Sequence, residues 1–165
     1  MSRSKLEFNS PSKGGVSVSE MTNDISGFVN EEPNSYYRLV IGTDSQIKRI
    51  NGHSECEYVT AIVIHRRGKG AKYFWRREKA KPMVLRDRIY DETTRSLQTA
   101  HELVPDLRKA VSAVKYDLEI HIDVGPIGPT REMIREVVGM VNGNGYVAKT
   151  KPDSWAASSV ADKHT

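Results

Sequence analysis

The chain has 165 residues, 38% of them apolar, and a net charge of +4, which is ordinary for one globular domain with one core. The longest uninterrupted apolar run, 61–64, is far shorter than the ~20 residues of a membrane span, and no signal peptide is visible. We therefore expect a cytoplasmic protein with no membrane segment. The single cysteine, Cys56, excludes an internal disulfide and a cysteine-based zinc ribbon.

The N-terminal residues lack any hydrophobic periodicity. Residues 1–16 are rich in Ser, Gly, Lys and Pro, so we expect a disordered arm before a single domain at 17–165. From a cap at Ser17 or Ser19, apolar residues recur at helical spacing until Glu31-Glu32-Pro33-Asn34 interrupts the pattern. This spacing predicts one short amphipathic helix.

The rest of the chain alternates between strand and helix patterns. Residues 36–43, 58–65 and 72–77 read as strands of an antiparallel meander. A long helix follows from Leu85, and Pro105 either kinks it or opens a second helix. Then come a strand at 118–124, a helix that Thr130 caps, a strand at 146–150 and a last helix from Ser154. The predicted order βββαβαβα indicates an α/β fold with a mixed five-stranded sheet.

The positive charge is concentrated in one segment. Residues 65–81 hold eight Lys or Arg and one acid, Glu78. Such a cluster is typical of a surface that binds a polyanion, although a solvated hairpin tip has the same composition. We predict that nucleic acid contacts this segment through four basic side chains, joined by Arg131 after the fourth strand; the four are Arg66, Arg67, Lys69 and Lys72.

Two aspartates follow apolar strands. Asp44 comes directly after Ile41-Gly42-Thr43, and Asp123 lies near the end of the fourth predicted strand. In open α/β sheets ligands collect outside the carboxyl ends of strands, so these acids share a site if their strands are parallel neighbours. A lone aspartate at a strand end is also common in turns that bond the local backbone.

Two further acids complete the candidate site. Glu92 lies on or beside the inward stripe of the long helix, where a carboxylate must be paired, protonated or bound to a metal. An ion pair with Arg88 or Arg95 is the alternative. On the last helix Asp153 stands at the cap position, whereas Asp162 lies in the helix body and is the better fourth ligand.

Three motifs carry a resemblance to a known family. The segments IGTDSQ at 41–46, HIDVGPIGPTRE at 121–132 and KPDSWAASSVADKHT at 151–165 resemble the YkuK-like family of predicted nucleases in the ribonuclease H-like superfamily. The likeness covers roughly residues 20–165. It implies a ribonuclease H-like fold with an N-terminal helix, and it places the superfamily's metal-binding acids at Asp44, Glu92, Asp123 and Asp162.

These observations favour a metal-dependent nuclease. Oxygen ligands suit Mg²⁺ or Mn²⁺, and two such ions activate a water and neutralise a phosphodiester in a two-metal mechanism. In this interpretation the basic segment holds the phosphate backbone beside the metals. The alternative is a non-catalytic nucleic-acid-binding or scaffolding module on the same fold, because a fold alone does not determine a function.

Overall fold

The computed structural model describes residues 7–111, 116–155, 159 and 160. Within these residues the strands form one mixed sheet in the order β2-β1-β5-β4-β3-β6-β7. Strands β3, β6 and β7 are parallel, and the other neighbours pair antiparallel. The strands are β1 (Phe8–Ser10), β2 (Gly14–Val16), β3 (Tyr37–Ile50), β4 (His53–Arg66), β5 (Ala71–Ala80), β6 (Tyr116–His121) and β7 (Val147–Lys149).

The sheet therefore has seven strands in the described residues, and the prediction of five is wrong. The two additional strands, β1 and β2, lie in the segment that we expected to be a disordered arm. They form a hairpin whose Asn9 pairs with Trp75 at the edge of β5. Such short strands are not stable alone, so docking against a larger sheet supplies their order.

Three α-helices and a short 3₁₀ helix complete the described fold: α1 (Val18–Glu31), α2 (Leu85–Ala110), η2 (Arg131–Met133) and α3 (Ile134–Gly143). Helix α1 begins at a capping box in which Ser17 and Glu20 each bond the other's backbone N–H. Helix α2 continues through Pro105 as one helix, with the proline on its exposed side. Of the predicted last helix, Ser154 and Trp155 are described and are not helical, so its predicted start is wrong; Ser159 and Val160 are helical, and the other residues lie outside the described ranges.

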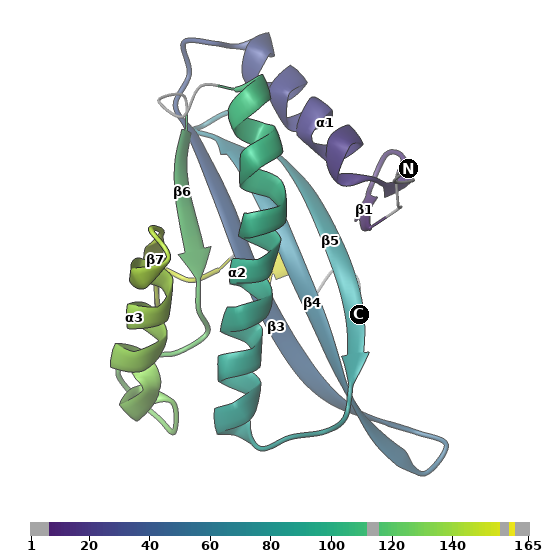
Figure 1. Cartoon of the computed structure of the whole chain (residues 1–165), viewed down its shortest axis with the longest axis vertical. Helices are drawn as coiled ribbons and strands as arrows, with labels where there is room; N and C mark the ends of the chain where they lie inside the picture. Colours follow the sequence, from purple (N-terminus) through teal and green to yellow (C-terminus); the bar gives the residue numbers. More distant parts are fainter. Residues whose placement is uncertain (1–6, 112–115, 156–158, 161–165) are drawn as a thin grey trace.

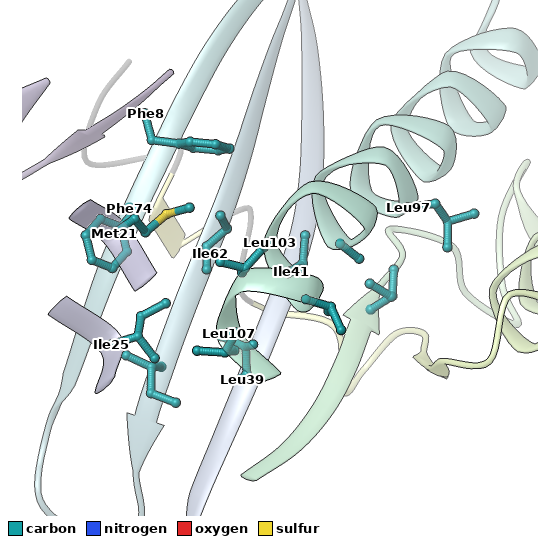
Figure 2. Packing of buried hydrophobic residues seen from close by; sticks show 14 of the residues in the cluster. Phe8, Met21, Ile25, Leu39, Ile41, Ile62, Phe74, Leu97, Leu103 and Leu107 are labelled. Atoms are coloured by element: carbon teal, nitrogen blue, oxygen red, sulfur yellow. The ribbon is translucent and has the colours of Figure 1, made fainter. Parts of the chain in front are cut away.

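The main core lies between the sheet and the helices α1 and α2, which cross one face of the sheet (Figure 1). Strand alternation sends one set of side chains from β3 and β4 to this face, and Figure 2 shows them meeting residues of α1 and α2. The opposite face carries a smaller cluster of Val40, Ala61, Val63 and Val160. Residues near the C-terminal end of the chain therefore cover the second face.

Strand β3 is longer than its apolar stretch predicts, which moves Asp44 relative to our expectation. The strand continues to Ile50, and Asp44 pairs with Val59 in the middle of the β3–β4 ladder. The prediction that Asp44 ends its strand is therefore wrong. Its parallel neighbour β6 does end nearby, because the last pair of that ladder joins Gly42 and His121. Asp44 thus lies just beyond the point where β3 loses its β6 partner.

Candidate metal centre

The parallel pairing of β3 and β6 brings Asp44 and Asp123 to the same level of the sheet. Each residue lies two positions beyond the final pair, Gly42 with His121. Both acids also act electrostatically on Glu92 of α2, whose pKa they raise. The structure therefore places Asp44 and Asp123 within electrostatic range of Glu92. The fourth, Asp162, lies outside the described residues.

Hydroxyl groups align α2 with the sheet beside these acids. Thr43 of β3 lies 2.8 Å from the Ser96 hydroxyl of α2 and 3.0 Å from the Thr60 hydroxyl of β4. Two residues further along β3, the Ser45 hydroxyl donates to Oε2 of Glu92. Sequence reasoning missed Ser45, although the alternation of β3 puts it on the same face as Thr43 and thus toward α2.

Glu92 is a buried carboxylate with one oxygen left over. Its side chain is 4% exposed, and Oε1 has no hydrogen-bond partner among the described residues. Burial raises the pKa of Glu92 to about 8, the Ser45 hydroxyl opposes this rise, and the charges of Asp44 and Asp123 add to it. The alternative ion pair with Arg95 does not form, because that guanidinium pairs with Asp91 and Glu78. Arg88 lowers the pKa of Glu92 through its charge but forms no ion pair with it among the described residues.

Asp123 has a cationic neighbour that sequence reasoning did not find. Lys151 Nζ lies 2.9 Å from Asp123 Oδ1, and both side chains reach solvent. The lysine follows β7, and its backbone N–H donates to the Val124 carbonyl, which holds the two segments together. A Cβ added at Gly125 would come within 3.2 Å of the Lys151 Cβ, so the glycine leaves room for the lysine stem.

These residues suit a hard divalent cation in their chemistry, because the donors are carboxylate oxygens and one of them is buried and unbonded. Within the described part of the chain, however, no group of three or more His, Cys, Asp or Glu side chains is close enough to hold a metal ion. Asp153 is exposed in the turn after β7, and the prediction that it caps a helix is wrong, because Ser154 and Trp155 after it are not helical.

His121 anchors the segment that leads toward the C-terminal residues. Its Nδ1 accepts the Trp155 backbone N–H at 3.2 Å, which leaves Nε2 to donate to Glu119 at 3.0 Å. Burial lowers the pKa of His121, while Glu119 opposes this effect. The histidine is therefore neutral at pH 7 and connects β6 to the segment that carries Trp155.

The predicted nucleic-acid contacts do not all lie together. Arg66 is 8% exposed, and its guanidinium stacks on Phe28 and donates to the Phe28 carbonyl, the Tyr37 hydroxyl and Glu31. This arginine packs α1 on the sheet, so we exclude it from the surface that would bind nucleic acid. Arg131 is exposed in η2, beside the loop that follows Asp123.

The basic β4–β5 turn is far from the acids. Tyr37 pairs with Arg66 and Asp44 pairs with Val59, so seven residues of β3, or about 23 Å, separate the two levels. The expectation that the basic segment lies beside the metals is therefore wrong for the turn, whereas Arg77, near the other end of the segment, pairs with Val59 and is level with Asp44. Lys69 Nζ also lies 3.3 Å from Glu32 Oε2, so this carboxylate compensates the charge of the lysine. Contact of Arg67, Lys69 and Lys72 with nucleic acid stays a prediction.

Comparison with known proteins places this arrangement in a family. The ribonuclease H-like family model matches residues 20–165, and the chain belongs to this family. It is 32% identical to the uncharacterized protein YkuK of Bacillus subtilis (strain 168), over 96% of each chain. No solved structure matches the chain. No helix in the described ranges is long and apolar enough to cross a membrane.

Proposed function

We propose that this protein is a metal-dependent nuclease that hydrolyses phosphodiester bonds of a nucleic acid. The observation that carries the proposal is the buried, unbonded Oε1 of Glu92 beside Asp44 and Asp123. A buried carboxylate without a partner is costly unless a proton or a cation compensates it. The charges of Asp44 and Asp123, which act on Glu92, make a divalent cation the more effective compensation.

The ligands that we propose for Mg²⁺ or Mn²⁺ are Asp44, Glu92 and Asp123, with Asp162 as the fourth. When bound, such ions supply positive charge that neutralises the phosphate and lowers the pKa of a water. Ser45 holds one oxygen of Glu92 in place and thereby directs the other, Oε1, away from the β3 hydroxyls. Lys151 brings a flexible ammonium group within reach of a phosphate at Asp123.

Two measurements test this proposal. Calorimetric titration with Mn²⁺ should show binding by the wild type and strongly reduced binding by the Asp44→Asn, Asp123→Asn double variant. Wild type should then cleave some member of a labelled panel of DNA, RNA, hybrid and branched substrates in Mn²⁺, and the double variant should not. Glu132→Gln, a change of an exposed carboxylate on η2, is the control. Equal Mn²⁺ affinity in wild type and double variant would refute the metal site.

A second candidate function is a nucleic-acid-binding module without catalysis. The ion pair between Lys151 and Asp123 favours it, because the ammonium compensates one carboxylate without a metal. This candidate predicts nucleic-acid binding that is independent of Mn²⁺, and no cleavage of any substrate in the panel. Detection of cleavage that the double variant lacks would exclude it.

A further inference from the structure

Strands β3 and β4 extend past the rest of the sheet as a two-stranded ribbon. They stay paired up to Ile50 and His53, whereas β5 ends at Ala80, opposite Cys56, and β6 ends at His121. We call residues 48–55 the β3–β4 ribbon, since they pair only with one another in the described ladders. Figure 1 shows the ribbon projecting beyond β5 and α2.

The ribbon ends in a narrow turn that suits insertion into a groove. Asn51 and Gly52 both have positive φ, 52° and 79°, which is the conformation of a tight type I′ turn. Exposed Arg49, Ile50 and His53 surround this turn. Ile50 is 39% exposed although it is large and apolar, and it is too far from the main core to join it.

The charge of the ribbon is positive toward its tip. Residues 48–54 contain Lys48 and Arg49 and no acid. The nearest acids are each paired with a lysine, Glu57 with Lys48 at 3.0 Å and Glu55 with Lys79 at 3.7 Å. The end of β5 next to the ribbon adds exposed Arg77, Lys79 and Lys81. Because these acids compensate Lys48 and Lys79, the cations that this end of the molecule presents to a polyanion are Arg49, Arg77 and Lys81.

The ribbon also begins near the candidate metal centre. Asp44 lies four residues before Lys48 and seven residues before Asn51 on β3, so the base of the ribbon is closer to the acids than its tip is. The basic β4–β5 turn lies at the other end of the same strands. The first ribbon residue, Lys48, is four residues or about 13 Å from Asp44 along β3, whereas the β4–β5 turn begins seven residues away, so the base of the ribbon is the nearer of these two cationic hairpin ends.

We infer that the β3–β4 ribbon enters the major groove of double-stranded DNA and that B-form DNA is the substrate class of the proposed nuclease. This inference rests on the proposed function for the cleavage step only. The major groove of B-form DNA, about 12 Å wide, admits a two-stranded ribbon. The major groove of double-stranded RNA is deep and narrow and does not, so the ribbon distinguishes the two duplexes.

The length of the ribbon sets a spacing on the DNA. Seven residues separate Asp44 from Asn51, which is about 23 Å along a strand. At 3.4 Å for each base pair, this distance corresponds to about seven base pairs. A ribbon that lies along the DNA therefore reaches up to about seven base pairs from the carboxylates, and one that enters the groove tip first reaches fewer.

Fluorescence anisotropy in EDTA tests the inference without any metal. Duplexes of one sequence are made as DNA and as RNA, and the variants are Arg49→Ala and Ile50→Ala. Wild type should bind the DNA duplex more tightly than the RNA duplex. Each variant should weaken DNA binding about tenfold, which corresponds to the loss of one contact in the groove. Arg108→Ala removes the same charge at the far end of α2 and should leave DNA affinity unchanged.

Several results would overturn the inference. Equal affinity for both duplexes, an Arg49→Ala affinity equal to that of Arg108→Ala, or no DNA binding by wild type would each refute it. Sedimentation velocity tests whether the ribbon instead joins two copies of the chain; a dimer that Ile50→Ala dissociates, with unchanged DNA affinity, would also refute it. Melting curves establish that the variants fold. DNA binding through the ribbon without cleavage in Mn²⁺ would refute the nuclease and support the ribbon.

Discussion

Replacing Glu92 by Gln should stabilise the metal-free protein, by an amount that depends on pH. Glu92 is buried, and its pKa rises from an ordinary value of 4.5 to about 8. A raised pKa means that the folded state favours the protonated acid. The contribution of this group to stability is therefore complete below pH 4.5 and is lost as the pH rises through about 8.

The magnitude follows from the size of this shift. Each pH unit between the unfolded and folded pKa costs about 1.4 kcal/mol of unfolding free energy, so the loss at pH 7 is about 3 kcal/mol. Gln has the shape of Glu without its charge, and it still accepts the Ser45 hydroxyl. Its amide NH₂ would lie where Oε1 is unbonded, near the negative charges of Asp44 and Asp123.

Urea denaturation in EDTA measures this effect. The Glu92→Gln variant should exceed wild type by less than about 1 kcal/mol at pH 5 and by up to about 3 kcal/mol at pH 7. Added Mg²⁺ should reverse the order, because a ligand that binds only the folded state stabilises wild type more. The control Glu132→Gln, on the exposed surface, should match wild type throughout. A variant that is no more stable than wild type at pH 7, in EDTA, would refute the reasoning.

Three further predictions concern stability around the site and the basic turn. Arg66→Ala should lower the unfolding free energy in urea by about 3 kcal/mol, because it removes the stacking on Phe28 and the buried hydrogen bonds to the Phe28 carbonyl and the Tyr37 hydroxyl; a loss under 1 kcal/mol would contradict this. Gly125→Ala should lower the melting temperature in wild type but not in Lys151→Ala, since the new Cβ would meet the lysine stem at 3.2 Å; equal effects in both backgrounds would exclude that contact. His121 should stay neutral below pH 6.5 in an NMR titration, so its contribution to stability is present above that pH and lost as the pH falls through its lowered pKa; protonation at or above pH 6.5 would contradict its burial.

The local sequence pattern was sufficient to predict the type of most helices and strands of this protein. Helix α1 follows from Ser17 and Glu20 as a capping box and from apolar residues at helical spacing. The alternation of β6 and the long apolar stripe of α2 similarly predict their type. The inward position of Glu92 could also be predicted, because helical spacing alone places it on that stripe.

The pairing of strands in the folded protein decided where the candidate site residues lie. The polar residues after Thr43 do not read as a strand, and β3 continues through them because β4 pairs with every one up to Ile50. Strands β1 and β2 are too short to predict, and their order comes from docking on β5. Lys151 reaches Asp123 only because β7 adds in parallel beside β6.

The basic segment shows most clearly which properties the sequence determines and which depend on the tertiary structure. Its composition determines that 65–81 is cationic, and the turn glycines predict a hairpin. The charge of this segment does not say which end of it lies near Asp44. Antiparallel pairing carries the β4–β5 turn away from Asp44 and brings Arg77, the partner of Val59, level with it. Composition likewise cannot distinguish buried Arg66 from exposed Arg67, because their burial depends on which face of β4 meets α1.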